Sequence, residues 1–223
     1  MRSLPLPLAL TARLSPVAVL ACAGWVLTSG PATEAPDTAA AKDTQQTQSE
    51  ETSKGPASTA VTKTYTEAPT PCTSVATKTI TSLVPGAKTA GKEIPSTDTA
   101  VRRTCSWNAL KEFDYRWLDV SFEITESDDA AQTSYKERLK EKSGGGAVPG
   151  LGDEAYSVVN LTTEDKQQTR EGVVIARVSN ALVVVTYNGS DFESRKSPST
   201  DVINKGAIKA AKDVVAALQK KSG

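Results

Sequence analysis

The sequence predicts an α+β domain in which a curved antiparallel β-sheet of about five strands packs with three helices. Two observations support this prediction most directly. Apolar and polar residues alternate through residues 118–125, which indicates a strand with one buried and one solvated face, as in an antiparallel sheet. Residues 200–218 instead place apolar side chains on one helical stripe. A sheet face and a helical stripe of this kind can bury each other.

The folded part is expected to open with a short helix and a strand. The helix carries its apolar side chains at helical spacing: Ala76, Ile80, Leu83 and Val84. Thr73 or Ser74 can cap its start, and Pro85-Gly86 ends it. Residues 101–107 predict the first strand, where Arg103 interrupts the apolar face and marks a bulge or a sheet edge.

The second strand, residues 118–125, is followed by a helix that runs to about Lys142. Asp128 and Asp129 can cap the start of this helix. Its apolar face holds three side chains: Ala131, Tyr135 and Leu139. The glycines that follow Ser143 end it.

The last third of the chain predicts three strands and a final helix. The strands are residues 156–161, 173–178 and 182–187. Residues 162–170 read as a polar connection, and Ser179-Asn180 reads as a tight turn. The final helix has five apolar side chains on one stripe: Ile203, Ala207, Ala211, Val214 and Leu218.

The N-terminal residues 1–27 predict a signal peptide or a membrane anchor. Arg2 and Arg13 precede an apolar run, which is the order of a secretory signal. Cys22 ends a Val-Leu-Ala-Cys stretch similar to a bacterial lipobox, so Cys22 is a candidate lipid acceptor. Lipidation at Cys22, an uncleaved anchor and simple cleavage with release remain three alternatives.

Residues 28–71 predict a disordered linker rich in Thr, Ala, Ser, Gln and Pro. Only Val61 and Tyr65 in this stretch are large enough to seed a core, so burial cannot offset the entropy of ordering. Residues 72–223 then form a single extracellular α+β domain.

Composition excludes several function classes. Lysine plus arginine and aspartate plus glutamate both total 26, so no basic field attracts nucleic acid, and none is expected as a partner. The chain has no histidine, which removes the commonest general base and metal ligand. The folded part also has no S-x-x-K or G-x-S-x-G pattern. We therefore expect no catalytic residues, no metal and no cofactor.

Cys72 and Cys105 bracket the start of the folded part and form the smallest disulfide framework. In an oxidising compartment they are expected to pair, because Cys105 lies on the inward face of its strand and Cys72 precedes the first helix. Two unpaired buried thiols are the alternative.

Aromatic residues of the first two strands give the one candidate binding surface. Trp107 follows the apolar register and is expected in the core. Trp117 falls on the polar register, so Trp117 with Tyr115 and Arg116 is predicted to be an exposed contact surface.

Other motifs have simpler interpretations. Residues 150–155 fit the dinucleotide pattern G-x-G-x-x-A, but they enter a strand and not a helix, so a turn is expected. Asp153 and Glu154 are expected to cap or to face solvent, not to form a catalytic pair. Asn160-Leu-Thr and Asn188-Gly-Ser match the N-glycosylation pattern, and Asn188-Gly189 favours a turn.

Several of these features together resemble a known family. They are Pro71-Cys72 before a short helix, Cys105-Ser106-Trp107, the segment Pro-Gly-Leu-Gly-Asp-Glu-Ala-Tyr at 149–156 and the valine-rich hairpin. From about Cys72 onward the chain resembles an actinobacterial exported lipoprotein family, domain of unknown function 3558. That family is similar in layout to extracellular sensor domains of mycobacterial receptor kinases. The resemblance implies a sheet with helices, a disulfide and binding of a ligand or partner, and it brings no catalytic residues.

The sequence thus favours a binding or sensing module anchored at the outer face of the cell membrane. The hairpin and the loops around residues 144–152 are expected to contact a small ligand, a glycan or an envelope protein. The membrane is the expected partner of the N-terminal segment or its lipid. The alternatives are an envelope hydrolase using carboxylate or Ser/Lys chemistry, and a passive structural lipoprotein.

Overall fold

The computed structural model describes residues 63–221, which fall within the compact unit Pro56–Gly223. The signal or anchor segment, Cys22 and the linker up to residue 62 lie outside the described residues. None of the helices in residues 63–221 combines the length and apolar character needed to cross a membrane.

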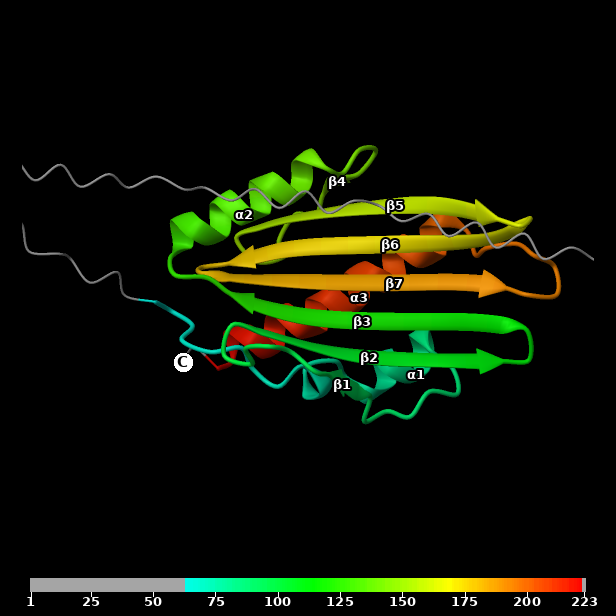
Figure 1. Cartoon of the computed structure of the whole chain (residues 1–223), viewed down its shortest axis with the longest axis horizontal. Helices are drawn as coiled ribbons and strands as arrows, with labels where there is room; N and C mark the ends of the chain where they lie inside the picture. The colour runs from blue at the N-terminus through cyan, green and yellow to red at the C-terminus, as the bar shows by residue number, and fades with distance from the viewer. Residues whose placement is uncertain (1–62, 222–223) are drawn as a thin grey trace, which may run out of the picture. The chain divides into compact units, whose positions relative to one another are not determined.

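One antiparallel sheet of seven strands forms the centre of the domain, in the order β1-β2-β3-β7-β6-β5-β4 (Figure 1). The strands are β1 (Lys92–Ile94), β2 (Arg102–Lys111), β3 (Asp114–Ile124), β4 (Gly146–Ala147), β5 (Glu154–Glu164), β6 (Gln167–Val178) and β7 (Ala181–Asp191). The α+β class is confirmed, but about five strands was an undercount. The two missed strands, β1 and β4, have only three and two residues, too few for alternation to mark them.

Three tight hairpins, β2–β3, β5–β6 and β6–β7, build most of this sheet. The predicted turn at Ser179-Asn180 joins β6 to β7, since Val178 pairs with Ala181. The polar connection predicted for residues 162–170 is wrong, because β5 and β6 continue through it and pair up to Glu164 and Gln167. Asp165 and Lys166 both have positive φ, at 48° and 68°, which is the backbone of a type I′ turn.

The turn expected at Asn188-Gly189 is also wrong, because both residues lie inside β7. Gly189 pairs with Arg116 of β3 and Arg170 of β6. A Cβ atom there would lie 2.8 Å from Pro198 Cγ, so the glycine permits close packing instead of a turn.

The helices are the 3₁₀ turn η1 (Pro71–Thr73), α1 (Thr77–Leu83), α2 (Asp128–Lys140) and α3 (Thr200–Gln219). Ser127, not Asp128 or Asp129, caps α2 by accepting a hydrogen bond from the Ala130 amide at 3.1 Å. Thr73 and Ser74 lie at η1 and do not cap α1. Instead, the Ala76 amide donates to the Asp213 carboxylate of α3 at 3.1 Å. Tertiary packing thus supplies a cap that the local sequence lacks.

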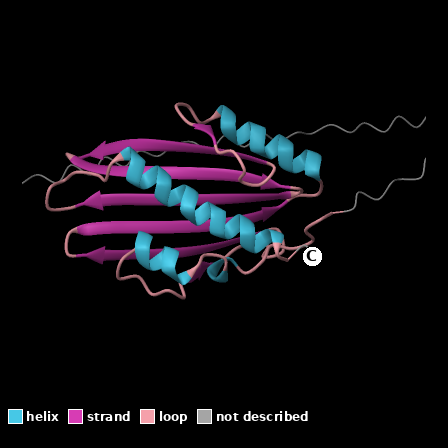
Figure 2. Ribbon diagram, turned by 180° about the vertical axis from the view of Figure 1, so that it is seen from behind, coloured by secondary structure: helices cyan, strands magenta, loops and turns pink. Residues whose placement is uncertain are grey.

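The sheet has two differently covered faces. Helices α3 and α1 cover what we call the helical face, the side of β3 that carries Leu118, Val120 and Phe122 (Figure 2). All five predicted stripe residues of α3 are fully buried there. On the opposite front face, which carries Trp117, Asp119 and Ser121, helix α2 covers part of β5, β6 and β7. Its Tyr135 packs there against four apolar side chains: Val158, Val173, Ile175 and Leu182. No helix or strand within residues 63–221 covers the rest of the front face (Figure 1).

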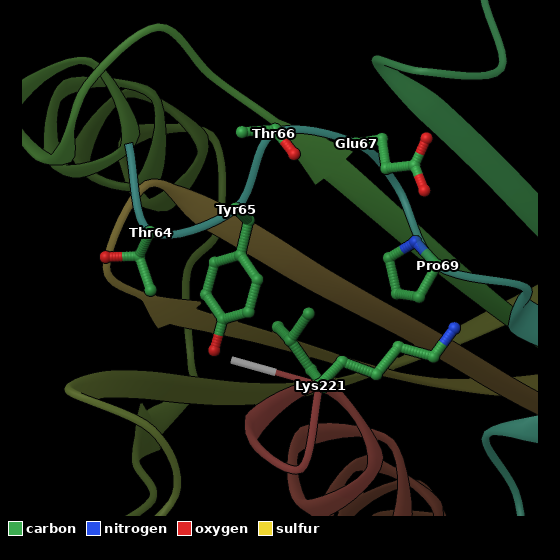
Figure 3. Close-up of a pocket in the computed structure, with 7 residues that line it drawn as sticks. Thr64, Tyr65, Thr66, Glu67, Pro69 and Lys221 are labelled. Carbon is green, nitrogen blue, oxygen red and sulfur yellow. The ribbon is translucent and has the colours of Figure 1, made fainter. Parts of the chain in front are cut away.

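The last residues of the predicted linker belong to the packed domain. Tyr65 and Ala68 are buried, and the amide side chain of Asn180 bonds both backbone groups of Tyr65, at 2.9 and 2.8 Å. Figure 3 shows the Tyr65 ring directed toward the end of α3 near Lys221, around a small hollow of about 170 Å³. A long-range hydrogen-bonding partner, which composition cannot reveal, holds this stretch in place.

Cys72 and Cys105 form a disulfide with their Cα atoms 5.1 Å apart, and it joins η1 to β2. Beside it, Arg103 makes two hydrogen bonds to the Glu93 carboxylate of β1, at 2.6 and 2.8 Å. The pairing of β2 with β3 is continuous through Arg103, so this residue marks the sheet edge and not a bulge.

Candidate binding surface

Exposed apolar side chains gather at one end of the sheet, where β2 turns into β3 and β7 ends. The exposed side chains are those of Leu110, Phe113, Trp117 and Phe192, and together with the half-buried Tyr115 we call them the aromatic corner. Trp117 is 37% exposed, and Phe192 and Phe113 are 48% and 52% exposed. A group of large apolar side chains that are exposed to solvent next to one another is typical of a surface that contacts a partner or ligand.

The strand register explains how the corner forms. Tyr115 and Trp117 are two residues apart on β3 and therefore share the front face. Leu110 pairs directly with Tyr115 across the β2–β3 ladder. The rings of Tyr115 and Trp117 meet edge to face, with centroids 6.5 Å apart. The hairpin thus places three of the five side chains side by side.

Phe192 arrives from the loop after β7. Its amide donates to the Phe113 carbonyl at 2.9 Å, and its ring lies 6.0 Å from that of Tyr115. The Asp191 carboxylate accepts hydrogen bonds from the Ser194 hydroxyl and amide, at 2.7 and 2.6 Å, and these bonds lower the pKa of Asp191. The loop that presents Phe192 is therefore held by its own backbone and side-chain contacts.

Hydrogen bonds fix the orientation of the Trp117 indole. Its Nε1 donates to Ser106 Oγ and to Asp119 Oδ1, both at 2.7 Å. Partial burial, with a smaller contribution from Asp119, raises the pKa of Tyr115, so its hydroxyl stays protonated at neutral pH. The corner therefore combines a fixed indole with an uncharged phenol.

The structure separates Arg116 from the other two predicted residues. Arg116 lies between Tyr115 and Trp117 in sequence and so points to the helical face. Its guanidinium pairs with Asp114 and donates to the Tyr115 carbonyl at 2.9 Å, and its side chain is only 15% exposed. The prediction that Arg116 shares an exposed surface with Tyr115 and Trp117 is wrong, since neighbouring strand residues face opposite ways.

Polar side chains line the front face beside the corner. Asn108 and Asn188 flank Trp117 on the two neighbouring strands. The Oδ1 atom of Asn188 is buried and has no hydrogen-bond partner among the described residues. The hydroxyls of Thr169 and Ser190 bond each other at 2.7 Å. This part of the sheet thus offers amide and hydroxyl groups next to aromatic rings.

The loop predicted to contact a ligand lines a separate hollow at the opposite end of the sheet. This hollow has a volume of about 400 Å³ and is bounded by residues 147–155 and Tyr135. Its two carboxylates are already engaged, because Arg177 contacts Asp153 at 3.1 Å and Glu154 at 3.0 Å. Burial acts to raise the pKa of Glu154, but hydrogen bonds from Gln132 and Arg177 outweigh burial, and the net pKa is lowered. Both carboxylates are occupied by Arg177, an arrangement that does not support acid/base chemistry.

Two further results concern chemistry. Within residues 63–221 no group of three or more Cys, Asp or Glu side chains is arranged to hold a metal ion. The G-x-G-x-x-A segment leads into β5 as predicted, with Gly150 and Gly152 at positive φ. It therefore lacks the helix that a dinucleotide phosphate would need.

Sequence reasoning missed three members of the corner: Leu110, Phe113 and Phe192. Leu110 and Phe113 flank Glu112, whose positive φ of 57° helps to form the hairpin turn, and a β2–β3 hairpin prediction would have found them. Phe192 carries no local signal, because it meets Tyr115 only through the pairing of β3 with β7.

No protein-family model matches this chain, and no curated protein matches its sequence. Among solved structures, the chain is similar to a crystal structure from Bacteroides thetaiotaomicron VPI-5482, with 12% identity and a TM-score of 0.34, over 54% of this chain and 47% of that one. It is also similar to the extracellular domain of PknH from Mycobacterium tuberculosis, with 14% identity and a TM-score of 0.26, over 52% of this chain and 63% of that one. The chain thus spans less than two thirds of either structure, and neither likeness is close enough to support an argument about function.

Proposed function

We propose that this protein is an exported, envelope-anchored binding module whose aromatic corner contacts a carbohydrate chain. The observation that supports the proposal most strongly is the set of four large apolar side chains, Leu110, Phe113, Trp117 and Phe192, left exposed around the half-buried Tyr115 at one end of the sheet. Isolated exposed apolar residues are ordinary, but an adjoining group rimmed by polar side chains favours recognition of a partner.

The chemistry around the corner favours a sugar over other ligands. A sugar ring presents an apolar face, which packs on aromatic rings such as Trp117, and a rim of hydroxyl groups. Asn108, Asn188 and Asp119 lie within the same face of the sheet and offer donors and acceptors for such hydroxyls. The near-balance of charge in the chain favours a neutral polymer over nucleic acid.

Export and anchoring are parts of the same proposal. Disulfides persist in oxidising compartments, so the Cys72–Cys105 bond favours a location outside the cytoplasm. Attachment through residues 1–27, by lipidation of Cys22 or by a membrane anchor, rests on the order of charged and apolar residues there. The proposal is a binding function without a catalytic step, and it is preferred here to the envelope hydrolase that the sequence left as an alternative.

Replacement of Trp117 by alanine is expected to lower binding to insoluble peptidoglycan by about fivefold or more, since loss of an aromatic contact is worth about 1–3 kcal/mol. The measurement is co-sedimentation of the purified chain with peptidoglycan over a concentration series. Val202→Ala is the matched control, because Val202 is 50% exposed but lies on α3 and outside the corner.

The expected pattern is loss of binding in Trp117→Ala and unchanged binding in Val202→Ala, with both variants folded by circular dichroism. Equal binding by the two variants would show that the corner does not make the contact. Absence of binding by the unsubstituted chain would reject peptidoglycan as the ligand.

A further inference from the structure

The outer edge of β5 is open along most of its length. Strand β4 pairs only with Tyr156 and Ser157, so residues 158–164 have no strand neighbour on that side within the described part of the chain. Figure 1 shows β5 extending well beyond β4. An edge of this length presents a row of unpaired backbone amides and carbonyls, which can accept another strand.

This edge also lacks the features that usually prevent pairing. Residues 158–163 read Val-Val-Asn-Leu-Thr-Thr, without charge, proline or glycine. Leu161 is 48% exposed, although it stands in the middle of a regular strand. An uncharged strand of β-branched and apolar residues is well suited to pairing.

The other edge of the sheet is better protected. Beyond β1, residues 107–111 of β2 form that edge, and Trp107 Nε1 donates to the Thr89 carbonyl at 3.0 Å. The backbone of Gly91 approaches the same indole so closely that a Cβ atom there would lie 2.6 Å away. The segment containing Thr89 and Gly91 thus lies against the start of this edge, and Lys111 adds a charge at its end.

The free part of β5 is complementary to itself. When two copies pair in antiparallel fashion over residues 158–164, the twofold axis passes Leu161, which then faces its own copy. Val159 faces Thr163 on the helical face, and Asn160 faces Thr162 on the front face. The one charged residue, Glu164, faces Val158, so no like charges meet. The free length is symmetric about Leu161, and the ladder would end where β4 begins.

We propose that two copies of this chain associate through their β5 edges into a symmetric dimer with one continuous sheet. Such a contact is isologous, with the same residues on both sides, which is the commonest geometry of homodimers. Each copy keeps its aromatic corner on the front face of the joined sheet. The dimer does not depend on what the corner binds.

Cross-linking of the full-length chain through a single introduced cysteine tests this register. Leu161→Cys places a thiol opposite its own copy, where directly paired Cβ atoms are about 4.5–5.5 Å apart. Mild oxidation is expected to convert this variant to a disulfide-linked dimer on a non-reducing gel. Thr163→Cys is the matched control, since its two thiols would be four residues apart along the ladder, or about 13 Å. The unsubstituted chain, which keeps Cys22, measures the background of dimers cross-linked through that residue.

Sedimentation velocity of the detergent-solubilised chain gives the second readout. The unsubstituted chain is expected to sediment as a dimer, and Leu161→Lys, which sets two positive charges opposite each other, is expected to weaken the dimer by about tenfold or more. A monomeric unsubstituted chain would overturn the proposal. So would equal cross-linking of Leu161→Cys and Thr163→Cys, or a dimer that Leu161→Lys leaves intact, because both would place the contact elsewhere.

Discussion

Replacement of Asn180 by alanine is expected to lower the free energy of unfolding by about 3 kcal/mol or more. Asn180 is fully buried, and its side chain bonds the Tyr65 amide, the Tyr65 carbonyl and the Thr125 carbonyl at 2.9, 2.8 and 3.0 Å. Alanine removes all three bonds and leaves buried groups without partners, each costing about 1–3 kcal/mol. Urea unfolding followed by circular dichroism measures the change.

Asn108→Ala is the matched control, because Asn108 is an exposed asparagine of β2, and its loss is expected to change stability by no more than about 0.5 kcal/mol. In Asn180→Ala the segment around Tyr65 is also expected to become sensitive to limited proteolysis. A loss below about 1 kcal/mol, with this segment still protected, would contradict the role given to Asn180.

Removal of the Cys72–Cys105 disulfide is the second large effect expected. The bond joins residues 33 apart in sequence, and the loop that it closes restricts the unfolded chain. The chain-entropy estimate for such a loop is about 3–4 kcal/mol. The double variant Cys72→Ala, Cys105→Ala is therefore expected to unfold at a lower urea concentration and with a steeper slope, because the unfolded chain without the bond exposes more surface. Cys105 is buried, so part of the loss will come from lost packing.

The same double variant measured against the reduced unsubstituted chain separates the two contributions. If the cross-link, and not the packing of the cysteine side chains, causes most of the loss of stability in the double variant, reduction of the unsubstituted chain will cause most of the same loss. A double variant as stable as the oxidised chain would show that the bond does not support the fold.

The alternation of side chains predicted the centre of the sheet well. Phe122 and its neighbours on β3 are buried as the pattern requires, and the β6–β7 hairpin turns at Ser179-Asn180 as expected. The alternation of apolar and polar residues does not mark strand ends, because both faces of the sheet are exposed to solvent there and the side chains are polar. The β5–β6 hairpin was therefore missed, since Asp165-Lys166 adopts a turn usually formed by Asn-Gly.

The candidate site was predictable only in part. The polar register of β3 indicated an exposed Trp117 beside Tyr115, and the strand period alone could have excluded Arg116. Phe192 could not have been placed, because it reaches Tyr115 only after β3 and β7 pair. The buried position of Tyr65 likewise depends on Asn180, which is 115 residues away in sequence.

The most direct test of the aromatic corner is an NMR titration of protein labelled with ¹⁵N-tryptophan. The chain has three tryptophans, and the buried Trp107 serves as an internal control for Trp117. With soluble peptidoglycan fragments as the probe, the Trp117 indole signal is expected to shift and saturate while the Trp107 signal stays in place. A Trp117 signal that does not move at saturating fragment, or one that moves only together with Trp107, would contradict binding at the corner.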